Sequence, residues 1–189
     1  MGKGALRSVP TIHPHCNLDG GHAALCPPYD SCALEDHVTG KKYKSFQYRN
    51  NLVWDTARRG RTSAPDKPDI EIGSPPEFKG EPGVWAPEEM LVAALNACMM
   101  LTFVSFAQSK RLEFVAYESA AEGLLENVDG KYRIVEVSVR PTLVLRSEAD
   151  IATARTIMAE VKENCFISNS ITADVKLAPQ FRMAPDVVT

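Results

Sequence analysis

Two stretches of the chain alternate between apolar and polar positions, and this pattern predicts β-strands. Across residues 135–140 every second position is valine and the positions between are polar. This stretch follows Asp129-Gly130, a dipeptide typical of tight hairpin turns, so we expect an antiparallel pair of strands. Residues 171–177 alternate in the same way and predict a last strand. Pro141 cannot donate to a β-ladder and suggests a sheet edge or a bulge at that position.

Two other stretches follow a helical pattern. Proline is favoured at the first position of a helix, so we expect one to begin at Pro87, with Glu88 and Glu89 at the positive end of its dipole. It continues through residues 90–107, which contain no charged side chain. A second helix is predicted over residues 148–164. Its apolar stripe includes Ile151, Ala154, Met158 and Val161, and Cys165 continues that stripe, so Cys165 is expected to face inward.

Before the first helix the pattern predicts a small β unit. Residues 43–54 have strand character, Arg58-Arg59-Gly60-Arg61 reads as a charged turn, and a second short strand follows near residues 70–72. Residues 74–83 are rich in proline and glycine and predict a loop. The predicted order of elements is β-β-(β)-α-β-β-α-β, which defines an α+β domain.

The beginning of the chain has no such periodicity. Residues 1–36 are rich in Pro, Gly, His and Cys, and we interpret them as a poorly ordered extension to a domain of residues 37–189. The extension contains possible zinc ligands at His13, His15, Cys16, His22, Cys26 and Cys32. Their spacings fit no established finger pattern, so no metal site is expected.

Composition excludes some classes of function. A net charge of -3 and a pI near 5.8 argue against a nucleic-acid partner, because no basic patch is available to neutralise phosphates. The first residues lack the apolar run of a signal peptide. The five cysteines are therefore better interpreted as thiols than as a disulfide framework, and a cytoplasmic location is expected.

The uncharged stretch 90–107 is long enough to raise the question of a membrane span. Asn96, Thr102 and Ser105 are scattered through it, and a helix that is apolar all round can equally lie at the centre of a protein. We therefore expect no membrane, with an anchor kept as the weaker alternative. Burying such a helix takes more surface than one small sheet supplies, which indicates a partner subunit.

The residue inventory leaves few groups that could do chemistry. All four histidines lie at or before position 37, which argues against a Ser-His-Asp triad or a histidine-rich metal site in the domain. No glycine-rich phosphate loop follows a strand. Cys98 and Cys165 remain, and either one alone would more often be an inert apolar filler. The arginines between positions 58 and 61 would, by themselves, be an ordinary solvated turn.

Read together, these residues have a family resemblance. The segment GVWAPEEMLVAALNAC, residues 83–98, resembles the helix start and first cysteine motif of the OsmC/Ohr family. The segment ENCFISNSI, residues 163–171, is similar to that family's second cysteine motif. The likeness covers about residues 43–181. It implies an OsmC-like fold with a long buried central helix, in an intertwined homodimer.

The resemblance also implies thiol peroxidase chemistry without metal, flavin or other cofactor. Cys98 matches the peroxidatic cysteine, Cys165 the resolving cysteine and Glu88 the conserved carboxylate. Arg58 matches the family's arginine if one residue is shifted, with Arg61 as the alternative. The implied activity reduces an organic hydroperoxide to an alcohol through a Cys98 sulfenic acid and a Cys98-Cys165 disulfide. An external dithiol, typically a lipoylated protein in this family, then restores the thiols.

The chain departs from the family pattern near both motifs. Val84, Trp85 and Ala86 replace the usual small polar residues, and Phe166 stands where a proline often follows the second cysteine. These changes put the shape of the substrate and the choice of arginine in doubt. A non-catalytic relative that binds a small apolar ligand in the same pocket therefore stays an alternative hypothesis.

The spacing of two implied site residues predicts how the site is assembled. Glu88 and Cys98 are ten residues apart on one expected helix, which separates them by about 15 Å along its axis. They cannot meet within one chain. The carboxylate that serves Cys98 is therefore expected to come from a second copy of the chain.

Overall fold

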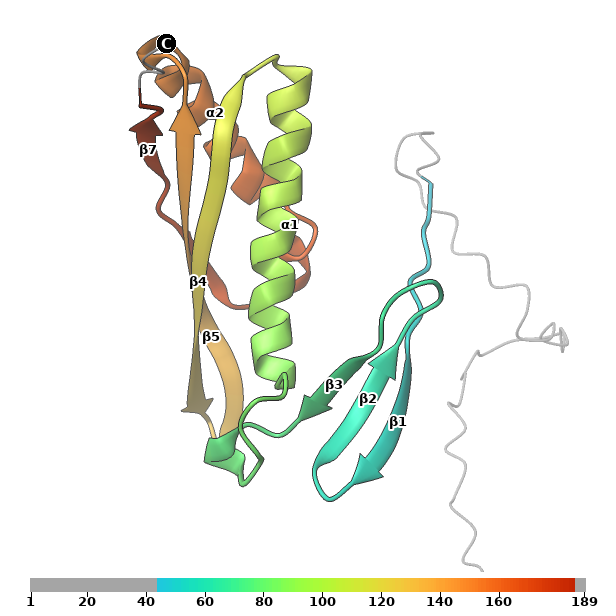
Figure 1. Ribbon diagram of the computed structural model, residues 1–189. Coiled ribbons are helices and arrows are strands. Elements are labelled where there is room, and N and C mark those ends of the chain that lie inside the picture. The colour runs from blue at the N-terminus through green and yellow to red at the C-terminus, as the bar shows by residue number, and fades with distance from the viewer. Residues whose placement is uncertain (1–43, 186–189) are drawn as a thin grey trace, which may run out of the picture. The chain divides into compact units, whose positions relative to one another are not determined.

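The computed structural model describes residues 44–185 (Figure 1). The helices and strands are β1 (Asn51–Thr56), β2 (Arg59–Ser63), β3 (Ile70–Gly73), α1 (Pro87–Ser109), β4 (Phe114–Val128), β5 (Lys131–Leu145), α2 (Ile151–Asn164), β6 (Asp174–Leu177) and β7 (Gln180–Met183). Three single turns of 3-10 helix, η2 (Pro76–Phe78), η3 (Glu148–Asp150) and η4 (Ser168–Ser170), lie between them. The α+β class is confirmed. The extension predicted over residues 1–36 lies outside the described residues.

The long β4-β5 hairpin forms the larger sheet. Its two strands pair antiparallel from Phe114 opposite Leu145 to Val128 opposite Lys131. The predicted turn is confirmed, because Asp129 and Gly130 have φ values of 53° and 80° and join the strands directly. Two positive φ angles give the turn the twist that the strands need, and glycine adopts such an angle without steric cost.

Strand β5 is the centre of this sheet, and neither the sheet edge nor the bulge suggested at Pro141 is found, since Pro141 lies in register opposite Ser119. β5 pairs with β4 on one side and, in parallel, with β6 and β7 on the other. Its pairing with β6 ends at Val139 and its pairing with β7 begins at Thr142. Pro141 falls in the gap between these two short strands. It is fully buried, and because neither short strand pairs with β5 at this position, its missing N–H breaks no ladder bond with them.

The smaller sheet has the order β1-β2-β3 and is antiparallel throughout. The prediction that residues 58–61 form a turn is only partly right, since the turn is Ala57-Arg58 and Arg59 already lies in β2. The charged residues of β2 form ion pairs with neighbouring elements: Arg59 with Glu71 and Glu81, and Arg61 with Asp55. β2 therefore consists mostly of polar residues that are held by ion pairs. It lacks the alternation of apolar and polar positions by which a strand is predicted from sequence.

Helix α1 begins where the sequence predicts. Pro87 is its first residue, and the Glu89 carboxylate accepts a hydrogen bond of 2.8 Å from the N–H of the N-cap residue Ala86. Proline loses nothing at this position because the first N–H groups of a helix have no partner within it. The helix then runs without interruption for 23 residues.

The core lies between the two helices and one face of the larger sheet. Phe103 of α1 packs edge-on against Phe114 at 5.2 Å and in a tilted arrangement against Tyr117 at 5.4 Å between ring centroids. Each element contributes one regular stripe of fully or almost fully buried residues. These are Leu95, Met99, Phe103 and Ala107 of α1, Val137, Val139, Pro141, Leu143 and Leu145 of β5, and Ala154, Ile157, Met158 and Val161 of α2.

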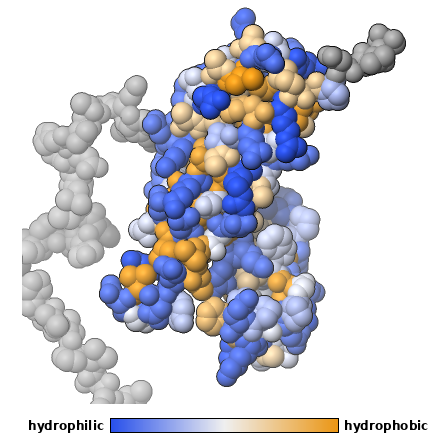
Figure 2. All heavy atoms as spheres, turned by 90° about the vertical axis from the view of Figure 1, so that its left-hand side faces the viewer, coloured by the Kyte–Doolittle hydropathy of each residue, from blue (hydrophilic) through white to orange (hydrophobic). Residues whose placement is uncertain are grey.

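The burial expected for α1 is found on one side of the helix only. The opposite face is apolar or uncharged and open to solvent, with Leu101 62% exposed between Ala97 and Ser105. Within the described residues, α1 is the one helix long and apolar enough to cross a membrane, and 22% of its most apolar window is buried. Figure 2 shows further hydrophobic surface lying open among hydrophilic residues. A single chain therefore leaves much apolar surface uncovered.

The C-terminal part agrees with the prediction in its helix and differs in its strands. α2 ends at Asn164, and Cys165 faces inward as predicted. The last predicted strand is shorter than expected, since β6 begins only at Asp174. β7 was not predicted. Its four residues are mixed in polarity, and it is a strand because its backbone pairs with the C-terminal end of β5.

Candidate functional site

Cys165 lies at the C-terminal end of α2 and is fully buried. The chain leaves the helix at this residue and turns at once into η4, where Asn169 N–H donates 3.0 Å to the Cys165 carbonyl. The N–H of Ser168 donates to the Cys165 sulfur at 3.4 Å. The turn therefore holds this thiol in one place, directed toward α1.

Cys98 lies in the middle of α1 and is partly exposed. The backbone N–H groups of Ile167 and Phe166 and the Cys165 thiol lie near its sulfur, where they can stabilise a thiolate. The hydroxyl of Thr102, one turn further along the helix, donates to the Cys98 carbonyl at 2.8 Å. The two cysteines that the sequence singled out are thus brought together within one chain.

The surroundings give the two thiols opposite acidities. Burial disfavours the charged form of Cys98, but the hydrogen bonds to its sulfur outweigh burial and lower its pKa. Burial, together with the interaction of the Cys165 S–H with the Cys98 sulfur, raises the pKa of Cys165 to about 11. At neutral pH, Cys165 is a neutral thiol. The thiolate of this pair is therefore carried by Cys98, and a thiolate is the form of cysteine that attacks electrophiles.

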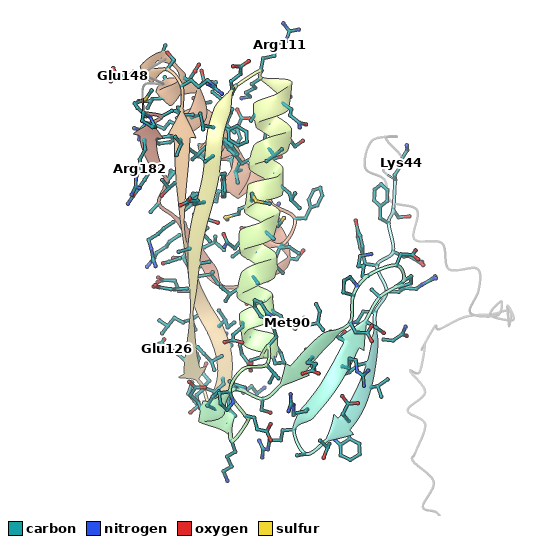
Figure 3. All side chains as sticks on the ribbon, viewed as in Figure 1. Lys44, Met90, Arg111, Glu126, Glu148 and Arg182 are labelled. Atoms are coloured by element: carbon teal, nitrogen blue, oxygen red, sulfur yellow. The ribbon has the colours of Figure 1, made fainter. Side chains whose placement is uncertain are left out.

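Glu88 lies in the first turn of α1, far from Cys98 along the helix axis. One oxygen of its carboxylate, Oε2, is buried and has no hydrogen-bond partner among residues 44–185. Glu88 lines two cavities. One, of 650 Å³, lies along α1 beside the half of the β4-β5 hairpin that is nearer its turn. The other, of 380 Å³, is lined mainly by residues of β1 to β3 and the loop after β3. Figure 3 shows Met90 of this first turn and Glu126 of β4 toward the same end of the domain, opposite Arg111 and Glu148.

Arg58 lies in the turn between β1 and β2 and lines the 380 Å³ cavity together with Glu88. Its guanidinium Nη1 donates to the carbonyl of Phe78 at 2.6 Å. Arg61, the alternative arginine, is bound to Asp55 at 3.3 Å and does not line that cavity. The structure therefore gathers the four candidates into two pairs, Cys98 with Cys165 and Arg58 with Glu88.

The two pairs do not form one site within a single chain. Cys98 lines neither cavity that Glu88 borders. Ten residues of continuous helix separate Glu88 from Cys98, a rise of about 15 Å. One chain by itself therefore leaves the cysteine pair apart from the pair formed by Arg58 and Glu88.

The choice between the two arginines leads to a first prediction. If Arg58 serves the thiolate, Arg58→Ala should raise the pKa of Cys98 and slow its alkylation at mildly acidic pH by about tenfold, because an opposite charge within 4 to 6 Å stabilises the charged form. The measurement is the rate of iodoacetamide labelling of Cys98 against pH. Arg61→Ala is the matched control. An unchanged profile for Arg58→Ala beside a shifted one for Arg61→Ala would reverse the assignment.

Metal binding finds no support in the part of the chain that the structure describes. Across residues 44–185 no group of three or more His, Cys, Asp or Glu side chains is placed to hold a metal ion. The histidines and cysteines considered as zinc ligands belong to the extension and lie outside these residues.

These features define a class of protein: an α+β domain in which a partly exposed cysteine on a central helix faces a second, buried cysteine. Residues 80–179 match the family model described as OsmC-like protein. The chain belongs to the OsmC-like family. It is 28% identical over 109 residues to the uncharacterised protein YmaD of Bacillus subtilis. The aligned region covers 56% of this chain and 73% of YmaD.

Solved structures share the fold. An OsmC-like protein of unknown function from Vibrio cholerae superposes with a TM-score of 0.66 and 25% identity, covering 71% of this chain and 99% of the other. An organic hydroperoxide resistance protein from Legionella pneumophila gives a TM-score of 0.60 at 18% identity, covering 74% and 99%. The organic hydroperoxide resistance protein OhrB of Bacillus subtilis gives a TM-score of 0.54 at 18% identity. The match covers 72% of this chain and 98% of OhrB.

Sequence reasoning missed the backbone contribution to the cysteine site. It assigned Phe166 only as a departure from a family proline, whereas the backbone N–H groups of Phe166 and Ile167 both contact the Cys98 sulfur. A proline at position 166 would have no N–H to donate. The absence of proline was the available signal, but only the turn after α2 shows where the N–H points.

Proposed function

We propose that this protein is a thiol-dependent peroxidase that reduces organic hydroperoxides to alcohols with Cys98 and Cys165. The observation that carries the proposal is the pairing of two cysteines from different elements, Cys98 with a lowered pKa and the buried Cys165 with a raised one. This combination supplies a nucleophile and, beside it, a second thiol protected from other reactions. Membership of a family whose relatives include organic hydroperoxide resistance proteins supports the choice of substrate.

The first step is attack of the Cys98 thiolate on the distal oxygen of the hydroperoxide. The S–O bond forms as the O–O bond breaks, the departing alkoxide takes a proton and leaves as an alcohol, and Cys98 becomes a sulfenic acid. Its sulfur is oxidised by two electrons and the peroxide is reduced by two.

The second step joins the two cysteines. Cys165 loses its proton and attacks the Cys98 sulfur, the sulfenic hydroxyl leaves as water, and a disulfide forms. The two side chains already influence each other's pKa, which supports their sulfurs lying close together before the disulfide forms. An external dithiol then reduces the disulfide and becomes oxidised itself. A lipoyl group is the dithiol that the family resemblance suggests.

Arg58 and Glu88 are proposed to complete the site from a second copy of the chain. The planar guanidinium of Arg58 would stabilise the thiolate and bind the peroxide oxygens, because its N–H donors form a fixed fork. Glu88, with its buried and unpartnered Oε2, would hold that guanidinium in place. Both residues line one cavity, which supports their acting together.

A homodimer is the proposed setting for this chemistry. The exposed face of α1 carries Ala94, Ala97 and Leu101 and no charge, so a second α1 can pack closely on it. Purification without detergent tests this arrangement against the membrane alternative. A protein that stays soluble as a dimer supports it, and a protein that is recovered only in detergent contradicts it.

The test of the proposed function is a count of thiols. One equivalent of tert-butyl hydroperoxide should remove two thiols from the domain, and peptide mapping should find them as a Cys98-Cys165 disulfide. Mapping distinguishes these from the cysteines of the extension. A sample mixed with tert-butyl alcohol is the control. Two free thiols after treatment with peroxide would favour the non-catalytic, ligand-binding alternative.

A further inference from the structure

The turn that carries Arg58 is fixed from two sides. On one side, the indole N–H of Trp54 donates to the Ala57 carbonyl at 3.1 Å. On the other, the N–H of Ser74 donates to the Arg58 carbonyl at 3.2 Å. The backbone beneath the guanidinium is therefore held by groups on β1 and just after β3.

The guanidinium itself is held by the Phe78 carbonyl. The 2.6 Å bond to Nη1 uses one of the five N–H groups of an arginine and leaves the others for a carboxylate and a substrate oxygen. Arg59 and Arg61 differ, because each is bound to a carboxylate of this chain. Among these three neighbours, Arg58 is the one that is held by a carbonyl and is not paired with a carboxylate in the described part of the chain.

The loop that presents the Phe78 carbonyl has a tightly closed geometry. The N–H groups of Phe78 and Gly80 both donate to the Pro75 carbonyl, at 2.9 and 3.1 Å. A side chain at position 80 would place its Cβ 1.5 Å from the Ser74 carbonyl oxygen, so only glycine fits there. The direction of the Phe78 carbonyl is thus set by the closed turn around it.

One side chain outside the loop also contacts it. Tyr132, two residues after the hairpin turn in β5, packs edge-to-face on the Phe78 ring, with centroids 5.9 Å apart and planes at 76°. This is the favoured geometry for an aromatic pair. Tyr132 is 63% exposed, so the contact contributes little to the core. It links the β4-β5 hairpin to the loop that holds Arg58.

We infer that Phe78 and Tyr132 are positioning residues for Arg58: the Phe78 carbonyl orients the guanidinium, and Tyr132 keeps the Phe78 loop in place. The inference rests on the proposed function, because it assigns these residues to the arginine proposed to act on Cys98. It adds two residues that act by positioning: Phe78, which lines the 380 Å³ cavity together with Arg58, and Tyr132, which lies outside that lining. Their effect on the reaction passes through Arg58 alone.

The test compares Tyr132→Leu, which removes the aromatic edge, with Tyr132→Phe, which keeps it. Tyr132→Leu should move the alkylation profile of Cys98 to higher pH and lower kcat/KM for tert-butyl hydroperoxide by roughly two- to tenfold, the range that one edge-to-face contact can transmit. Tyr132→Phe should behave like the wild type. Tyr48→Leu is the control for loss of an exposed tyrosine, since Tyr48 is 92% exposed.

A double variant decides whether the effect passes through Arg58. If it does, Arg58→Ala with Tyr132→Leu should be no slower than Arg58→Ala alone. Effects that multiply in the double variant would overturn the inference, as would a wild-type profile for Tyr132→Leu beside a shifted one for Arg58→Ala. If the proposed peroxidase function itself were wrong, the results would differ. In that case Arg58→Ala would have no effect, and peroxide would consume no thiols.

Discussion

Replacing Cys98 with serine is expected to lower hydroperoxide reduction to the uncatalysed background. The reason is that Cys165, the other cysteine of the described domain, is fully buried, and its pKa of about 11 leaves almost none of it as thiolate at neutral pH. It cannot take over the attack on the peroxide. The measurement is steady-state consumption of tert-butyl hydroperoxide with dithiothreitol as the reductant.

Cys165→Ser is the matched variant, and it should fail in a different way. Its Cys98 can still attack one peroxide, so a burst of one equivalent per chain is expected. No neighbouring thiol then protects the sulfenic acid, and mass spectrometry should find Cys98 progressively converted to sulfinic acid. Sustained turnover by Cys98→Ser would contradict the assignment of the nucleophile. A Cys165→Ser variant that resists overoxidation would contradict the assignment of the resolving thiol.

The parts of the fold that could be predicted from sequence are those specified by local patterns. Pro87 and the carboxylates after it mark the start of α1 because they act on the ends of their own helix. Asp129-Gly130 marks the hairpin turn because its backbone angles decide the turn. The stripe that ends at Cys165 gave the burial of that cysteine correctly, because the period of a helix fixes which side chains share a face.

The errors fall where a distant strand decides the structure. Pro141 suggested a sheet edge because proline lacks an N–H, yet the fold lets one neighbouring strand end and another begin at that point. β2 was assigned to a turn because its arginines look solvated, yet carboxylates on other elements pair with them. β7 has no pattern of its own. In each case the sequence within the segment does not contain the partner.

The candidate site follows the same division. Cys98, Cys165, Glu88 and Arg58 were selected from family motifs, and the structure brings them together in two pairs. Their catalytic roles stay predictions. The backbone N–H groups near Cys98 and the loop around Phe78 carry no motif, because they act through backbone direction and not through side-chain chemistry. Positioning of this kind becomes visible only in three dimensions.

Mixing two inactive variants is expected to restore activity if the site is shared between subunits. A Cys98→Ser chain keeps Glu88, and a Glu88→Ala chain keeps Cys98. Their heterodimer would contain one intact site, formed by the Cys98 of one chain and the Glu88 of the other, and one site that lacks both. After complete exchange of an equal mixture, half of the dimers are heterodimers and half of their sites are intact. Activity should therefore reach about a quarter of the wild-type value.

The matched control places both substitutions in one chain and mixes it with the wild type. In a shared arrangement, neither site of this heterodimer is complete, so exchange should reduce the activity of the mixture to about half of its starting value. In an arrangement confined to one chain, the wild-type subunit would keep its own site and nothing would be lost. The two mixtures should thus change in opposite directions, one gaining and the other losing activity. A fully active monomer, or mixtures that do not change although exchange is demonstrated by mass, would show that Glu88 does not act across subunits.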